Sequence, residues 1–433
     1  MTDVLHPRYL EVLLHGDTCG FLCELEGNCR FVPSERFRMA SGQPTLSLSL
    51  SIPGSPSVAA QIFANRFHPA LYNAGGQLPP FFAGLLPESE LRQRLENTRL
   101  KPEDRDDFGV LAAAGADLPG AVVVAPPADP HDIPEYARTF STSDGTNDFE
   151  SSAIEGATEG AASVSGVQNK LALSTMQRGK RYTMPGLGKL SDVIAKLPPR
   201  NDDSQIFNEY VAMQLAQAAG VEVAKCEPMP LEALDIPGIA EAAGSARSFL
   251  AVDRYDRVDN LRVHAEDACQ LLGRMPRAKY GSIGHFQMLV ALLDRLSPRG
   301  VLDVRQFFVR QAVNTLIGNS DAHLKNFSVL YADRNFPQLT PAYDIVCVAA
   351  LPGFASYGTN VAIDRMQRVQ TLDNYKQMAR ASGIAERIAT AAAKAAVSAA
   401  RATWPRLLDD LPAPVRMKQI VLERLASLPL AQV

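Results

Sequence analysis

Two aspartates and one asparagine in the second half of the chain have the types and the spacing of a phosphoryl-transfer site. In "GNSDAHLKNF", residues 318–327, Asp321 stands five positions before Asn326, and Asp344 ends the predicted hairpin that follows. Phosphoryl transfer needs a carboxylate that accepts the proton of the attacking hydroxyl, and oxygen ligands that hold magnesium on the phosphates. Asp321 therefore fits the base, and Asn326 and Asp344 fit the metal ligands.

The same loop also has a purely structural interpretation, in which Asn319 and Asp321 cap a helix. The catalytic interpretation needs a lysine on an upstream strand, and Lys196 in "SDVIAKLPP" has that position. Such a lysine neutralises the α- and β-phosphates as a compact point charge. Glu209, near the start of the next predicted helix, is either the partner of Lys196, as the helix glutamate is in protein kinases, or a first-turn glutamate favoured by the helix dipole.

Two further segments fit a nucleotide site, and each has a plainer alternative. "SVSGVQNK", residues 163–170, precedes a predicted strand and is a candidate phosphate loop, although its single glycine, Gly166, makes it a weak one. "AVDRYDR", residues 251–257, lies between a strand and the helical half of the chain, where the backbone of a hinge would hydrogen-bond a purine. It could equally be an ordinary charged strand end. The joint order of loop, lysine, helix, hinge, Asp-x-x-x-x-Asn, hairpin and aspartate favours one site.

The elements that must position these residues form three parts. Short alternating apolar runs in residues 1–125 predict a small antiparallel sheet, with helices near "PESELRQRLENTRL" and "DDFGVLAAAG" and a strand near "AVVVAPP". Residues 161–258 contain three strand-like runs, a helix at "SQIFNEYVAMQLAQAAG" that ends at Gly220, and a strand at "RSFLAVDRYDRV". Residues 259–433 are predicted to be mainly helical, apart from the hairpin "FSVLYADRNFPQLTPAYDIV".

Residues 126–160 differ in composition from the segments on both sides. They contain eight acidic residues against one arginine, and few large apolar side chains. Such a segment cannot bury enough apolar surface to offset the entropy lost on ordering. The sequence therefore predicts an acidic flexible linker here.

The overall composition excludes some classes of protein. With 433 residues, 46% of them hydrophobic, the chain has room for two or three domains with a sizeable core. The net charge of −4 argues against a broad binder of nucleic-acid backbone or of an anionic membrane. The trio Cys19, Cys23 and Cys29 lacks the partners of a zinc clip, and no signal peptide or membrane-length apolar run is present. These features predict a reduced, soluble, cytoplasmic protein without membrane contact.

Several longer stretches resemble the HipA-type serine/threonine kinases, the toxin components of bacterial HipBA-like toxin-antitoxin systems. The similarity runs over nearly the whole chain, and it is carried by "FFAGLLPESELR", "GADLPGAV", "SVSGVQNKLAL", "IAKLP", "NEYVAMQLAQAAGV", "LAVDRYDR", "HAEDACQ", "SDAHLKNFSVL" and "LTPAYDI". The resemblance implies an α+β fold of the bilobal protein-kinase-like (HipA-like) type. It would have an N-terminal β-rich module at residues 1–125, a kinase N-lobe-like part at 161–258 and a mainly helical C-lobe at 259–433.

The resemblance also implies roles for single residues. Asp321 would be the catalytic aspartate, with His323 beside it as a family-typical loop residue, and Asn326 and Asp344 would bind Mg²⁺. The residues implied to bind ATP are Ser165, Gly166, Val167, Gln168, Lys196, Asp253 and Tyr255.

A regulatory role is implied for the phosphate loop. Ser163 aligns with the serine on which such kinases phosphorylate themselves, and Ser165 is a rival or additional acceptor. A phosphoserine, with about two negative charges, would repel the ATP phosphates in the same loop. Alternatively, both serines only donate hydrogen bonds to the nucleotide.

The implied function is an ATP- and Mg²⁺-dependent kinase that phosphorylates a protein substrate. Translation would be arrested through an aminoacyl-tRNA synthetase, such as glutamyl-tRNA synthetase. The implied partner is a helix-turn-helix antitoxin (HipB-like), through which DNA would be contacted only indirectly. An alternative from a different class is a catalytically silent kinase-like scaffold that binds the antitoxin and acts as a transcriptional co-repressor. Phosphate incorporation would separate the two, whereas nucleotide binding would not.

Overall fold

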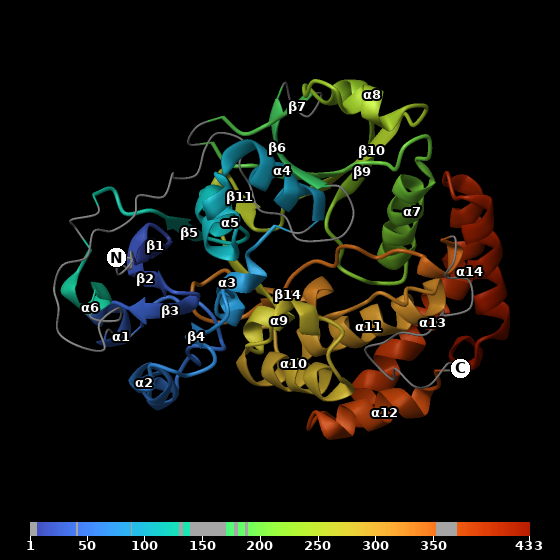
Figure 1. Cartoon of the computed structure of the whole chain (residues 1–433). Helices are drawn as coiled ribbons and strands as arrows, with labels where there is room; N and C mark the ends of the chain where they lie inside the picture. Colours follow the sequence, from blue (N-terminus) through green and yellow to red (C-terminus); the bar gives the residue numbers. More distant parts are fainter. Residues whose placement is uncertain are drawn as a thin grey trace.

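The computed structural model of the chain describes residues 7–39, 42–87, 89–129, 133–138, 170–176, 181–186, 189–351 and 370–433. The fold is of the α+β, bilobal, protein-kinase-like type (Figure 1). A β-rich N-terminal module, blue to cyan in the figure, lies beside a green N-lobe and a C-lobe of yellow to red helices. The fold class predicted from the sequence is confirmed.

The N-terminal module is built on an antiparallel five-stranded sheet with the order β4-β3-β2-β1-β5. Its strands are β1 (Arg8–Leu14), β2 (Asp17–Leu25), β3 (Asn28–Pro33), β4 (Tyr72–Asn73) and β5 (Val122–Ala125). Two-residue turns join the first three strands: His15-Gly16 and Glu26-Gly27 all have positive φ, as a type I′ turn requires. The helices are α1 (Glu35–Met39), α2 (Pro56–Ala64), α3 (Pro80–Gly84), α4 (Ser89–Arg99) and α5 (Asp107–Ala114).

Part of the predicted acidic linker belongs to this module. Residues 133–138 include the short helix α6 (Glu135–Arg138), which contacts β2. Ile133 and Ala137 are buried against Tyr9, Phe21 and Cys23 of the sheet. Two apolar side chains are thus enough to anchor a stretch that its acidic composition assigned to the linker. Residues 139–160 lie outside the described residues.

The N-lobe contains a second antiparallel sheet, with the order β7-β6-β8-β10-β9. Its strands are β6 (Lys170–Met176), β7 (Arg181–Thr183), β8 (Val193–Lys196), β9 (Cys226–Pro230) and β10 (Ser248–Asp253). Helix α7 (Ser204–Ala218) packs on β9 and β10, and α8 (Ile239–Ala243) lies in the connection between those two strands. A small hairpin, β11 (Arg257–Val258) and β12 (Leu261–Arg262), leads into the C-lobe.

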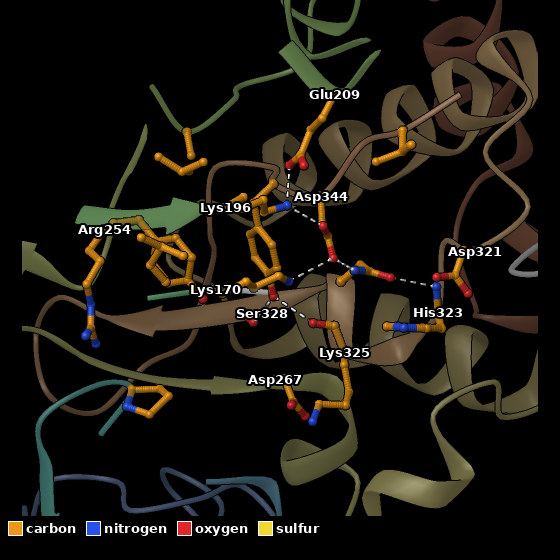
Figure 2. A pocket seen from close by; sticks show the side chains of 18 of the residues that line it. Lys170, Lys196, Glu209, Arg254, Asp267, Asp321, His323, Lys325, Ser328 and Asp344 are labelled. Carbon is orange, nitrogen blue, oxygen red and sulfur yellow. Dashed lines mark hydrogen bonds and ion pairs between the residues drawn. The ribbon is translucent and has the colours of Figure 1, made fainter. Parts of the chain in front are cut away.

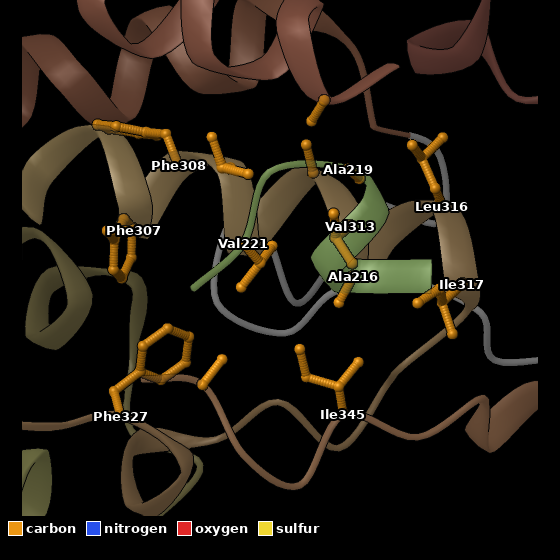
Figure 3. Close-up of a cluster of buried hydrophobic side chains, with 14 of the residues drawn as sticks. Ala216, Ala219, Val221, Phe307, Phe308, Val313, Leu316, Ile317, Phe327 and Ile345 are labelled. Atoms are coloured by element: carbon orange, nitrogen blue, oxygen red, sulfur yellow. The ribbon is translucent and has the colours of Figure 1, made fainter. Parts of the chain in front are cut away.

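The C-lobe is assembled around the buried helix α11 (Val301–Ile317). The other C-lobe helices are α9 (Ala268–Leu271), α10 (Ile283–Leu296), α12 (Leu372–Ala381), α13 (Glu386–Asp410) and α14 (Val415–Ser427). Every residue of α11 from Phe307 to Ile317 is buried, because α10, α13, α14 and the end of α7 surround it. Figure 3 shows Val313 and Ile317 of α11 near Ala216 of α7 and Ile345 of the segment after the hairpin. None of the described helices is long and apolar enough to cross a membrane.

The predicted hairpin is part of a three-stranded sheet. Strands β14 (Ser328–Tyr331) and β15 (Gln338–Leu339) pair as expected, and β13 (His264–Asp267) adds a third strand on the other side of β14. The polar sequence "HAED" gives no alternating apolar signal, and so β13 was not predicted. All four of its residues are buried, with the charged Glu266 and Asp267 satisfied inside the protein.

Candidate active site

A cleft with a volume of about 550 Å³ brings the predicted site residues together. N-lobe residues from β6, β8, α7 and β10 line it, as do C-lobe residues from β13 and residues 319–328 and 343–351. Gly84 and Pro119 show that the N-terminal module contributes to the wall. The predicted site residues on this lining are Lys196, Asp253, Tyr255, Asp321, His323, Asn326 and Asp344.

Lys196 is the centre of the buried charge in the cleft. It is the last residue of β8, and its Nζ donates to Oε1 of Glu209 on α7 and, at 2.5 Å, to Oδ1 of Asp344 (Figure 2). Glu209 lies in the second turn of α7 and is only 2% exposed. Of the two interpretations of Glu209, the pairing with Lys196 therefore holds, and the exposed first-turn glutamate does not.

The neighbouring charges in this group keep one another ionised by shifting their pKa values. Burial disfavours the charged form of Lys196, but the carboxylates of Asp344 and Glu209 outweigh it and raise the pKa of the ammonium above its usual range. Burial also disfavours the charge of Asp344, yet Lys170 and Lys196 hold the pKa of its carboxyl well below its usual range. The ammonium and the carboxylate of Asp344 are consequently both ionised at neutral pH.

The backbone of Asp344 has an unusual conformation. Its φ is +60°, a left-handed conformation that non-glycine residues adopt infrequently and that clusters at functional sites. Its Oδ2 accepts from Nδ2 of Asn326 at 2.9 Å and lies 3.9 Å from Nζ of Lys170, the first residue of β6. The two predicted metal ligands are thus in direct contact, although they are 18 positions apart in the sequence.

The Asp321 loop, residues 318–327, is held mainly by its own asparagines. Asn319 Oδ1 accepts from the backbone N–H of Asp321 at 3.2 Å, and Asn326 Oδ1 accepts from that of His323 at 3.0 Å. The Asp321 side chain itself is exposed. Burial and the nearby Lys279 lower the pKa of His323 to about 4, so its imidazole is neutral at pH 7. The helix-cap interpretation of Asn319 and Asp321 is wrong, because His323 is the N-cap of the short helix Leu324–Asn326 and Asn319 forms only a local turn hydrogen bond with Asp321.

At the hinge, residues 253–257, the two predicted adenine contacts differ in environment. Asp253 ends β10 with an exposed carboxylate that lies 3.8 Å from Nζ of Lys225. Tyr255 stacks on Tyr343, with ring centroids 5.4 Å apart. Burial and the nearby Asp256 raise the pKa of the Tyr255 phenol to about 12, so this side chain is neutral at pH 7. The hinge is thereby joined to the hairpin that carries the metal-ligand candidate.

A buried ionic cluster, called the hinge clamp below, fixes the hinge to the N-terminal module. It consists of Asp117 from the module and Arg254, Asp256 and Arg257 from the hinge. Arg254 lies 2.7 Å from Asp256 and 3.4 Å from Asp117, and Arg257 lies 2.8 Å from Asp117 and 2.9 Å from Asp256. Asp256 also accepts from the backbone N–H of Gly120 at 2.6 Å. These roles were not predicted, because only the tertiary structure brings "GADLPG" to "DRYDR".

Not all of the predicted residues can be located. Ser163, Ser165, Gly166, Val167 and Gln168, the predicted phosphate loop, lie outside the described residues. Other cleft residues were not assigned a role from the sequence, among them Lys170, Lys279 and Tyr343. The available signal for Lys170 was its place at the start of a strand directly after the candidate loop, in "QNKLAL".

Comparisons with known proteins agree with the resemblance seen in the sequence. The family model of the HipA N-terminal domain matches residues 10–125, and that of the HipA-like C-terminal domain matches residues 162–404. The Sinorhizobium fredii protein named "Putative kinase Y4dM" is 32% identical over 410 residues, 93% of each chain. The "Serine/threonine-protein kinase toxin HipA" of Shewanella oneidensis is 27% identical over 299 residues, 63% of each chain.

A solved structure shows the same fold. The HipA chain in the Shewanella oneidensis complex of HipA, HipB and operator DNA matches with a TM-score of 0.64 and 21% identity over 96% of each chain. Two family models that together span most of the sequence, and a relative at 32% identity over 93% of it, agree on one assignment. The chain belongs to the HipA family.

Proposed function

We propose that this chain is an ATP- and Mg²⁺-dependent serine/threonine protein kinase. The observation that carries the proposal is the convergence of Lys196, Asp321, Asn326 and Asp344 on one cleft. Lys196, paired with Glu209, is the group that binds the nucleotide phosphates. Asp321 accepts the proton of the acceptor hydroxyl as that oxygen attacks the γ-phosphorus, and ADP leaves.

Asn326 and Asp344 are the residues that would hold Mg²⁺. The ionised Asp344 carboxylate and Oδ1 of Asn326 are oxygen donors of the kind that this hard cation prefers. Asn326 contacts Asp344 through Nδ2, and its Oδ1 accepts from the backbone N–H of His323 at 3.0 Å, so that oxygen would have to exchange this hydrogen bond for the ion. No cluster of three or more His, Cys, Asp or Glu residues suited to a metal occurs among the described residues. None is required, since magnesium bound with a nucleotide takes its other ligands from phosphate and water. When bound, the ion would neutralise charge on the phosphates.

The adenine is assigned to the hinge beside Tyr255, where the cleft is lined by Ile194, Val252 and Val346. These side chains offer the apolar walls that a flat aromatic base needs. Because the hinge clamp holds Arg254, Asp256 and Arg257 on both sides of Tyr255, the backbone of this segment is held in one position. Lys170, only two residues after Gln168, lines the same cleft, which supports assigning residues 165–168 to the phosphates.

The biological setting follows from the relatives and is part of the proposal. The Shewanella oneidensis relative is named a kinase toxin and is seen with HipB and operator DNA. We assign to this chain a HipB-like helix-turn-helix antitoxin as partner, with DNA contacted through that partner. The substrate would be a protein such as an aminoacyl-tRNA synthetase, and phosphorylation of Ser163 or Ser165 would silence the enzyme.

The test is transfer of radiolabelled γ-phosphate from ATP, with Mg²⁺, to the chain itself and to proteins of a cell extract. We expect Asp321→Asn to reduce incorporation by at least about 100-fold, the usual contribution of a general base. Asp294→Asn is the matched control, because Asp294 is an exposed residue of α10 outside the cleft. Equal incorporation by wild type and Asp321→Asn would refute the catalytic role. Mass spectrometry of the same samples shows whether residue 163 or 165 carries phosphate.

A further inference from the structure

Tyr280 lies next to the Asp321 loop and contacts it through its hydroxyl and its ring. Its phenol donates to Oδ1 of Asp321 at 3.0 Å. Its ring packs edge-on against the imidazole of His323, with centroids 5.6 Å apart and an interplanar angle of 82°. Among the described residues, no other side chain donates a hydrogen bond to the Asp321 carboxylate.

The segment that carries Tyr280 is joined to the Asp321 loop through the backbone. The N–H of Leu324 donates to the carbonyl of Lys279 at 2.9 Å. Gly281, with φ +55°, approaches so closely that a Cβ there would lie 2.9 Å from Cδ1 of Leu324. Tyr280 is thus held between two residues that are each in contact with the loop, and its phenol is presented to Asp321 from a fixed backbone.

The hydrogen bond from Tyr280 restricts rotation of the Asp321 carboxylate. Rotation about χ2 of an aspartate is broad, so an exposed carboxylate does not keep one oxygen directed at a substrate. Asp321 is exposed, and none of the described residues gives it a buried charge partner of the kind that Lys196 is for Asp344. A donor on Oδ1 fixes the plane of the carboxylate and leaves the lone pairs of Oδ2 available.

We propose that Tyr280 is a positioning residue for phosphoryl transfer. Its phenol holds Oδ1 of Asp321, so that Oδ2 faces the acceptor hydroxyl. This inference rests on the proposed kinase function. It assigns Tyr280 to the catalytic step rather than to nucleotide binding, because its phenol and ring contact Asp321 and His323.

Tyr280→Phe tests the proposal, because it removes the hydroxyl and keeps the ring on His323. The purified chains are incubated with radiolabelled ATP and Mg²⁺, and incorporation is followed as a function of ATP concentration. We expect the rate constant at saturating ATP to fall roughly 10-fold, as for loss of a hydrogen bond to a charged group. The half-saturating ATP concentration should not change. Tyr280 is 37% exposed, so this change should leave the melting temperature nearly unchanged.

Tyr72→Phe is the matched control. It also removes a phenol hydrogen bond, the one to Oδ1 of Asn28 at 2.6 Å, but it does so in the N-terminal module away from the cleft. An unchanged or increased saturating rate for Tyr280→Phe would overturn the proposal, and so would a loss equal to that of Tyr72→Phe.

Failure of the kinase function would be recognised separately. If the wild type transfers no phosphate to itself or to any protein, the proposed function is refuted. Crystal structures of the wild type and of Tyr280→Phe then decide the positioning role. The same single orientation of the Asp321 carboxylate in both structures would overturn it, whereas a rotated or multiply oriented carboxylate in the variant would support it.

Discussion

Individual charged residues in this protein are stabilised by different means. Lys196 is buried and Asp344 is half-buried; each pairs with the other and with a second opposite charge, Glu209 for the lysine and Lys170 for the aspartate. Glu266 is also fully buried, but it has only neutral partners. Its carboxylate accepts from Tyr331, from the backbone N–H of Leu48 at 3.0 Å and from Ser47 at 2.7 Å. Glu266 therefore joins the N-terminal module to β13, and none of the described residues supplies it with a compensating cation.

Glu266 should make stability depend on pH. Burial raises its pKa to about 7 in the folded protein, above the usual value of 4.5. The folded state therefore binds the proton more tightly than the unfolded state, and stability falls as pH rises from about 4.5 to about 7. Glu266→Gln mimics the protonated form and should lose this dependence. At pH 8 we expect the variant to be more stable than the wild type, by about 3 kcal/mol at most.

Denaturant unfolding of both proteins between pH 5 and pH 8 measures this difference. The two free energies of unfolding should be similar at pH 5 and should separate progressively above it. Glu241→Gln is the control, since Glu241 is an exposed residue of α8. A difference between wild type and Glu266→Gln that does not change with pH would contradict the assignment of the shift to this carboxyl.

For single residues, the sequence predicted which side chains lie together only where those residues belong to one continuous segment. The convergence of Asp321, Asn326 and Asp344 on one cleft could be predicted, because a loop and the following hairpin hold all three. The partners of Tyr280 and Asp117 could not, since each contact joins segments 41 or more positions apart and the sequence carries no pairing signal for them. For Glu209, the sequence identified the residue but left two interpretations, an ion pair with Lys196 or a favourable interaction with the helix dipole. The burial of Glu209 in the structure decides between them.

At the scale of elements, the structure depends on how the N-terminal module attaches to the hinge. The hinge clamp buries two aspartates and two arginines between them, and each aspartate contacts both arginines. Such a cluster fixes the position of the N-terminal module relative to the hinge, because its four charges are paired only in this one arrangement. The module thus holds Arg254 and Arg257, which stand on either side of Tyr255, a residue assigned to adenine binding.

Asp117→Asn should weaken this attachment. The change leaves Arg254 and Arg257 with one carboxylate in place of two, and we expect a loss of about 2–4 kcal/mol in the free energy of unfolding. The half-saturating ATP concentration should rise as the hinge loses its fixed position. Calorimetry and nucleotide titration measure the two effects. Asp17→Asn, an exposed aspartate in the same module, should change neither. Loss of stability with unchanged nucleotide affinity would show that the clamp has no role in the cleft.

Local patterns predicted most elements but not all of their neighbours. Short apolar runs separated by glycine predicted the first strands of the N-terminal module, and apolar periodicity predicted α7 and the strands β6, β7 and β8. Strand β13 was missed because its sequence is polar and its burial comes from β14 and the segment at residues 46–48. The anchoring of α6 was missed because composition over a long window hides two buried apolar residues.

At the scale of the whole molecule, the cleft is a shared surface. Its lining combines Gly84 and Pro119 of the N-terminal module, Lys196 of the N-lobe and Asp344 of the C-lobe. A nucleotide bound there, as proposed, would contact the N-lobe and the C-lobe, and the hinge clamp and Glu266 connect the N-terminal module to the rest. The three parts should therefore respond to the ligand together.

Calorimetry with a non-hydrolysable ATP analogue and Mg²⁺ tests this coupling. Ligand at about 100 times its Kd stabilises the folded state by about 2.7 kcal/mol, which for a chain of this size is a rise of about 3 °C in Tm. We expect one transition that moves as a unit. Lys196→Met should abolish the rise, because the phosphates lose their cation, while Lys225→Met, at the exposed hinge edge, should retain it. If two transitions appeared and only one shifted, the N-terminal module would be an independent unit, because a clamp that transmits binding energy cannot leave one side of itself unaffected.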